Sequence, residues 1–160
     1  MPCKFQLEQY QLASVAVSGN EAFDGSLARH GGEITTSLTV APHKRDGSRY
    51  RLTLDVTVKA DEKNRAAGFP YDVAIKGHAF YIFQEPCGQE EKESFMHMHG
   101  AAILYGLLRA QVAQITAQSV NGQFLLPTVN FADEAEKSKN RLPEKAAPRR
   151  LVKRAPPKGA

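Results

Sequence analysis

The sequence holds few side chains whose type and spacing could support chemistry. His97 and His99 form a His-x-His pair downstream of Cys87, and such a pair ligates zinc when a loop or strand presents both rings on one side. No second Cys-x-x-Cys or histidine cluster completes four ligands. The alternative is that the pair forms the polar entry to the helix that follows. We therefore expect neither a metal nor another cofactor.

Catalytic groups are equally sparse in the sequence. Ser14 and Ser18 have no visible general base, and the carboxylates of residues 133–136 form a solvated run. A glycine-rich phosphate loop, a nucleophile elbow and a pair of carboxylates in an apolar setting are all missing from the sequence. The chain is therefore expected to bind something rather than to act as an enzyme.

Length and composition favour one ordinary domain. The 160 residues contain no apolar run of eighteen and no signal-peptide pattern at the start, which predicts a cytoplasmic protein. Two cysteines do not make a disulfide framework, so both are expected to be free thiols.

The net charge of +4 is unevenly distributed. Residues 137–160 contain nine basic side chains and one acidic side chain, which leaves residues 1–136 with a net charge of −4. Prolines, alanines and charges without periodicity predict a disordered basic tail after a folded domain of residues 1–136. Such a tail either keeps the protein soluble or contacts an acidic partner, nucleic acid or an anionic membrane.

Four segments have the alternation of apolar and polar residues that is typical of strands: residues 5–17, 33–40, 50–59 and 71–83. The first changes phase, which predicts a bulge or bend near residues 8–10. The second and third flank an Asp46-Gly47 turn and should pair as a hairpin. Gly77, inside the fourth, indicates a bulge or a close backbone approach. We expect an antiparallel sheet of these sequential strands.

Residues 100–118 have the apolar spacing of a helix that lies on a surface. Asn121-Gly122 and Pro127 then stop the helical period and predict an extended crossover. Strands followed by a helix indicate an α+β fold. The apolar stripe of this helix consists of Ile103, Leu104, Leu107, Leu108, Val112 and Ile115.

The order and spacing of five segments resemble the SecB family of export chaperones, which hold precursor proteins unfolded. The segments are FQLEQYQL, YRLTLDVTV, FPYDVAIKGHAF, AILYGLLR and LPTVNF, and the similarity covers roughly residues 4–131. The resemblance implies a four-stranded antiparallel sheet, one long helix, and a short or frayed second helix. It also implies dimers or dimers of dimers, no cofactor and no catalysis.

In this family unfolded client polypeptides bind in grooves between the sheet and the segment after the long helix. Carried over to this chain, the groove consists of Ile34, Thr36, Leu38, Phe124 and Leu126. The alternative for these five side chains is that they fill a core. The oligomer interface carried over in the same way consists of Leu104, Leu107, Leu108, Val112 and Ile115.

The chain also departs from the family pattern. SecB docks on the SecA motor through acidic side chains on the outer face of the sheet, and here Ser14 and Ser18 occupy two of those positions while Asp72 remains at the third. Fewer charges weaken docking, so ordinary SecA partnership is not expected. Residues 130–139 contain no apolar residue after Phe131 except two alanines, so a second helix has little reason to dock.

Two classes of function remain open. The first is a SecB-like chaperone for unfolded chains, serving either export or one dedicated client such as the antitoxin of a toxin-antitoxin pair. The second is a binding or scaffold protein that acts through its basic tail on nucleic acid or an acidic partner.

Overall fold

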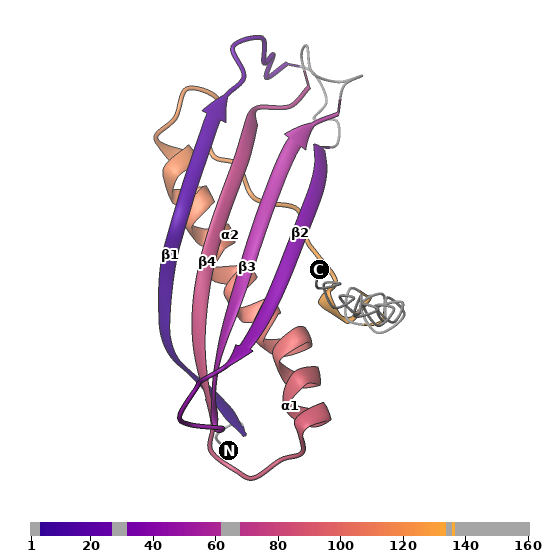
Figure 1. Cartoon of the computed structure of the whole chain (residues 1–160). Helices are drawn as coiled ribbons and strands as arrows, with labels where there is room; N and C mark the ends of the chain where they lie inside the picture. Colours follow the sequence, from indigo (N-terminus) through magenta and orange to yellow (C-terminus); the bar gives the residue numbers. More distant parts are fainter. Residues whose placement is uncertain (1–3, 27–31, 62–67, 134–135, 137–160) are drawn as a thin grey trace, which may run out of the picture.

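The structure, a computed structural model, describes residues 4–26, 32–61, 68–133 and 136. Four strands, β1 (Phe5–Gly19), β2 (Gly32–Pro42), β3 (Arg49–Ala60) and β4 (Tyr71–Phe83), form one antiparallel sheet. One continuous helical stretch follows, made of α1 (Gln89–Phe95), the π-helical turn η1 (Met96–Gly100) and α2 (Ala101–Ala117). A short helix begins at Phe131. The helices lie on one face of the sheet (Figure 1), and the predicted α+β class is confirmed.

The strand order is β1-β4-β3-β2. β2 and β3 pair over their whole length as the predicted hairpin. β1 pairs with β4 instead of with its neighbour in sequence, so β1 and β2 are the two edges of the described sheet. Each edge strand carries backbone groups that no neighbouring strand of this sheet uses.

β1 contains two bulges, at Glu8 and Ala13, where its register against β4 shifts. The sequence pattern predicted the first. The prediction that the apolar residues of β1 change from one face to the other at this bulge was wrong. Paired residues of neighbouring strands lie on the same face, and Leu7, Leu12 and Val15 all pair with residues on the helix side of β4. The bulges therefore bring all the large apolar side chains of β1 to the same face.

The core lies between the sheet and α2. The alternate side chains of β3 and β4 are buried there, and α2 contributes Leu104, Leu108 and Val112, all fully buried. A Cβ on Gly77 would lie 2.8 Å from Cδ2 of Leu108. The glycine is therefore a point of close approach between β4 and the helix, which was one of the two predicted reasons for it.

The helical stretch begins at Gln89, eleven residues before the predicted start at Gly100. Residues 89–94 are almost entirely polar, so they lack the apolar period that marks α2. Met96 is fully buried, and the Tyr81 hydroxyl donates a hydrogen bond of 2.8 Å to the carbonyl of Gly100. These contacts fix η1 on the sheet.

The crossover after α2 has no strand neighbour and is held by three hydroxyl groups. The buried Thr116 hydroxyl accepts the Phe124 N–H at 2.9 Å and donates to the Val112 carbonyl at 2.7 Å. The Tyr71 hydroxyl donates to the Gly122 carbonyl at 2.8 Å, and the Tyr105 hydroxyl donates to the carbonyl of Pro127. Side chains thus satisfy backbone groups that a sheet would otherwise pair.

Phe131 is buried and packs edge-on against Tyr105 with ring centroids 5.5 Å apart. This contact anchors the start of the short second helix, although the residues after it offer little apolar surface. Among the described residues, no helix is both long and apolar enough to cross a membrane. The predicted tail, residues 137–160, lies outside the described residues, so its boundary with the folded domain stays a prediction.

Candidate functional site

The edge strand β2 presents a row of half-buried side chains on the helix side of the sheet. Ile34, Thr36 and Leu38 alternate with exposed residues, and Ile34 and Leu38 pack against the core without being covered by it. This is where the structure places the three strand residues of the predicted groove. Their arrangement offers apolar surface beside an edge of strand backbone, and an extended peptide can use both.

The other two predicted groove residues lie deeper. Phe124 is buried against Phe69 and Tyr71, with ring centroids 5.4 Å and 6.1 Å apart, and Leu126 is fully buried. Leu125, between them, is 54% exposed. The crossover therefore points alternate side chains into the core and out to solvent, and its outward apolar residue is Leu125. The sequence does not show this alternation, because Phe124, Leu125 and Leu126 are all apolar.

A cavity of about 360 Å³ opens between β2 and the first helical turns. Its floor combines Leu38, Val40 and Tyr50 with polar side chains of α1 and η1. Such a depression, apolar below and polar at its rim, accepts a side chain without demanding a particular one. It is lined by Leu38, Thr39, Val40, Pro42, Tyr50, Gln89, Glu93 and His97.

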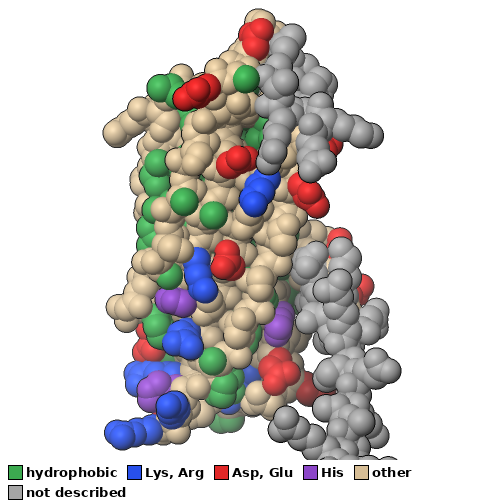
Figure 2. Space-filling model, turned by 45° about the horizontal axis from the view of Figure 1, so that its top comes forward, with side chains coloured by type: hydrophobic (Ala, Val, Ile, Leu, Met, Phe, Trp, Pro, Cys, Tyr) green, Lys and Arg blue, Asp and Glu red, His purple; other side chains and the backbone are tan. Residues whose placement is uncertain are grey.

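A second apolar surface follows β1. Leu7, Leu12 and Val15 are 37%, 40% and 39% exposed, although they lie on the helix side of the sheet. Figure 2 shows hydrophobic side chains along the side of the molecule that β1 forms. This strip was missed in the sequence because the bulges made the apolar residues look divided between two faces.

The predicted oligomer interface is divided by the structure. Leu104, Leu108 and Val112 have no accessible surface and pack on the chain's own sheet. Leu107 and Ile115 are half-buried. Of the five predicted residues, these two retain accessible surface, and Ile103 of the same helix, outside the predicted set, is 43% exposed.

The histidines and serines considered for metal binding and catalysis lie in separate parts of the fold. His97 and His99 lie within η1, and the His99 ring packs on Phe95 at 5.4 Å. No three His, Cys, Asp or Glu side chains of the described part converge to hold a metal. Ser14 and Ser18 point to the outer face with Asp72, which pairs with Ser18 across the strands.

Burial shifts the pKa of Tyr81 on β4 and of Tyr105 within α2. It raises the pKa of Tyr105 to about 12, and it raises the pKa of Tyr81 further. Both hydroxyls therefore stay protonated at neutral pH and act as hydrogen-bond donors to backbone carbonyls. They are structural groups rather than acids or bases for a reaction.

No protein-family model and no curated protein matches the sequence. Among solved structures, the chain is similar to the Mycobacterium tuberculosis SecB-like chaperone Rv1957, determined in complex with a ChAD peptide from the Rv1956 HigA1 antitoxin. The TM-score is 0.62 at 13% identity, and the match covers 79% of this chain and 91% of the other. A protein of unknown function from Streptococcus agalactiae aligns with a TM-score of 0.41 at 10% identity, over 78% and 97% of the two chains. The resemblance predicted from the sequence is confirmed for the fold.

Proposed function

We propose that this chain, which has the fold of the SecB-like chaperones, binds non-native polypeptides and keeps them soluble. The observation that carries the proposal is the half-buried apolar row of β2, next to an open strand edge and the cavity of about 360 Å³. An unfolded segment placed along β2 would bury side chains in the cavity and pair its backbone with the edge. This work needs no cofactor and no catalysis, and its place is the cytoplasm.

Binding of this kind is driven by apolar area. Each apolar Å² removed from water contributes about 25 cal/mol, whatever the sequence of the client. Several side chains of a client placed along Ile34, Leu38 and Val40 would together supply the affinity. Folded proteins do not expose such segments, so selectivity for unfolded chains follows without a specific recognition motif.

A narrower form of the proposal is a chaperone dedicated to one client. The similar chaperone from M. tuberculosis was solved with an antitoxin peptide, and the outer sheet face here carries Ser14 and Ser18 beside Asp72 instead of three carboxylates. With fewer charges for a SecA-type partner, service to one dedicated client, such as an antitoxin, becomes the favoured form. Protection of several unrelated denatured proteins to the same extent would argue for the general form instead.

The test is suppression of aggregation of a chemically denatured substrate at stoichiometric ratio. Leu38→Asp places a charge on the helix side of β2, and Ser37→Asp, its neighbour on the exposed outer face, is the matched control. We expect the first to weaken protection at least about tenfold and the second to leave it unchanged. Equal protection by both variants would remove β2 from the binding site.

We also propose that the protein self-associates through the exposed strip of β1. Leu7, Leu12 and Val15 leave apolar area open beside an unpaired strand edge, which a second copy can cover. Leu107, Ile115 and the more exposed Ile103 are accessible apolar helix positions for further association into a dimer of dimers. Light scattering should show a dimer or tetramer for the wild type and a smaller species for Leu12→Asp. A monomeric wild type would end this proposal.

A further inference from the structure

The outer face of the sheet carries a depression at the end where β2 and β3 are joined; it shares Pro42 and Tyr50 with the cavity beside β2, and the proposed function uses none of its basic side chains. We call it the hairpin basin. It has a volume of about 540 Å³ and is lined by Glu8, Ala41, Pro42, His43, Lys44, Arg45, Arg49, Tyr50, Arg51 and Phe80. Four basic side chains thus face one carboxylate, a net charge of +3 with neutral histidine. Figure 2 shows Lys, Arg and His side chains gathered at the lower left of this face.

The basin has an apolar floor. Phe80 lies on the outer face of β4, opposite Arg51 of β3 and Gln9 of β1, and it remains partly exposed. Ala41 of β2 pairs with Arg51 from the other side, so one residue from each of the four strands lies in a row beneath the basin. An aromatic ring surrounded by guanidinium groups suits a ligand that is both anionic and apolar.

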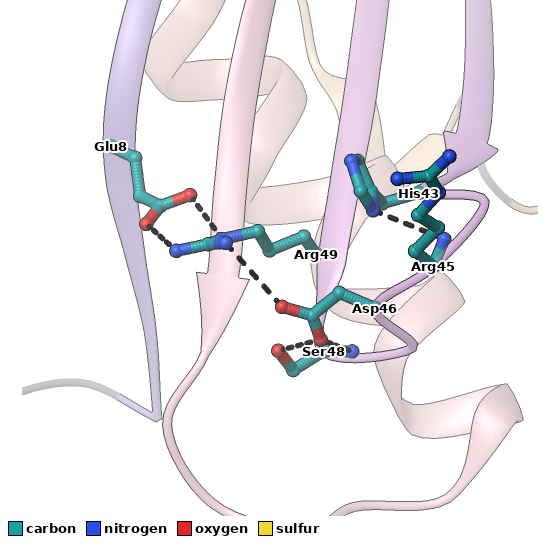
Figure 3. Close-up of polar contacts among 6 residues, drawn as sticks. All are labelled: Glu8, His43, Arg45, Asp46, Ser48 and Arg49. Carbon is teal, nitrogen blue, oxygen red and sulfur yellow. Dashed lines mark hydrogen bonds and ion pairs between the residues drawn. The ribbon is translucent and has the colours of Figure 1, made fainter.

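The rim is held in place by its own polar contacts (Figure 3). Arg49 binds Glu8 through Nε and Nη2, at 3.0 Å and 3.1 Å, and lies 3.5 Å from Asp46. Asp46 accepts the Ser48 N–H at 2.9 Å, and hydrogen bonds from Ser48 lower the pKa of its carboxyl group. The turn is therefore ordered without help from the remaining basic side chains.

Those remaining side chains are available to a partner. Lys44, Arg45 and Arg51 are exposed and form no ion pair within the described part of the chain. Burial lowers the pKa of His78 on the same face, and the positive charges of Arg51 and Lys76 lower it further. Basic groups held close together without counterions favour an anionic ligand.

We propose that the hairpin basin docks an acidic peptide segment whose carboxylates meet Lys44, Arg45 and Arg51 while one apolar side chain covers Phe80. Nucleic acid fits less well, because a phosphate chain needs a basic stripe along several successive phosphates, whereas these basic side chains surround one depression. A lipid surface would need a flat or protruding basic patch, whereas this one is a depression. Charge and shape together favour the peptide.

The test uses the full-length protein and a short fluorescein-labelled peptide in which glutamates flank one phenylalanine. Anisotropy is measured at about 50 mM and about 300 mM salt, where screening of exposed charges differs strongly. The combined variant Lys44→Glu, Arg45→Glu, Arg51→Glu should bind at least about tenfold more weakly. Lys59→Glu, an exposed change on the same face at the far end of β3, should bind as the wild type does. The basic segment of residues 137–160 is present in every variant, so differences among them report the basin.

Phe80→Ala tests the apolar floor separately. It should weaken the phenylalanine peptide by about three- to tenfold and leave a matched alanine peptide unchanged. Phe80→Ala without effect on either peptide, or equal losses in Lys59→Glu and the triple variant, would overturn the proposal. The proposal would also be overturned if a single-stranded oligonucleotide or phosphatidylserine vesicles displaced the labelled peptide more strongly than the unlabelled peptide does at equal concentration of negative charge.

The proposals for the hairpin basin and for the β2 groove can be tested independently of each other. All variants are first checked for wild-type thermal unfolding, since the three charged side chains are exposed and Phe80 is only partly buried. The triple variant should still suppress aggregation of a neutral denatured substrate, because the basin lies on the opposite face from Leu38. Loss of both activities together would show that the two surfaces are not separate and would contradict the assignment.

Discussion

The hydroxyl of Thr116 holds the crossover to α2, and its contribution to stability can be tested by substitution. It is fully buried, accepts the Phe124 N–H at 2.9 Å and donates to the Val112 carbonyl at 2.7 Å. Thr116→Val keeps the shape of the side chain and removes both hydrogen bonds. The Phe124 N–H is then buried without a partner, which costs about 1–3 kcal/mol, and the loss at Val112 adds about 1 kcal/mol. We expect the free energy of unfolding to fall by about 2–4 kcal/mol.

Urea denaturation at one fixed protein concentration measures this change. With a slope of about 2 kcal/mol/M, the midpoint should fall by about 1–2 M. Thr116→Ser keeps the hydroxyl and should lose only about 1 kcal/mol for the missing methyl group. Thr128→Val, an exposed change of the same kind on the same segment, should stay within about 0.5 kcal/mol of the wild type. A Thr116→Val protein no less stable than Thr116→Ser would refute the assignment of the hydroxyl as the anchor.

Three further outcomes follow from the packing. Gly77→Val should lower the free energy of unfolding by about 1–3 kcal/mol in a thermal or urea melt, because even a Cβ there meets Leu108 at 2.8 Å; wild-type stability would contradict the close approach. Tyr105 has a pKa of about 12 in the folded protein, against an ordinary value of 10.0. The unfolded chain therefore loses the Tyr105 proton at lower pH than the folded protein does. The contribution of the protonated hydroxyl to stability is complete below pH 10 and is lost between pH 10 and 12. Tyr105→Phe should therefore flatten the alkaline decline measured by urea melts at successive pH values, and an unchanged slope would count against it. Leu125→Asp should leave the fold intact by circular dichroism and Leu126→Asp should not, since the first side chain is exposed and the second is buried; the reverse order would mean that the crossover faces are misassigned.

The sheet core could be predicted from the sequence because β3 and β4 are central strands. Each has one face against α2 and one against solvent, so apolar and polar residues alternate from Tyr50 through β3, and every second residue of β4 from Tyr71 onward is apolar or glycine. The hairpin of β2 and β3 could also be predicted, because the Asp46-Gly47 turn separates two segments in which apolar and polar residues alternate. Local pattern and tertiary environment agree in these elements.

Other parts could not be predicted because the signal lies in three dimensions. Residues 89–94 carry no apolar stripe, and their helix is fixed through Phe95 and Met96 at its far end. An apolar helix position looks the same in sequence whether it meets its own sheet, as Leu108 does, or remains accessible, as Leu107 does. The hairpin basin also depends on long-range pairing, because Glu8 and Arg49 are 41 positions apart.

The two bulges of β1 limit how a second strand can pair with that edge. If Glu8 and Ala13 were both removed, the large apolar side chains of residues 5–17 would occupy every second position, so the bulges keep these side chains on one face without creating the pattern. What they do is break the edge into short regular pieces, of which residues 14–19 form the longest. An incoming strand finds continuous backbone only there, next to the small side chains of Ser14, Ala16 and Ser18. The bulges thereby limit the length of β1 backbone that could act as a template for uncontrolled strand addition.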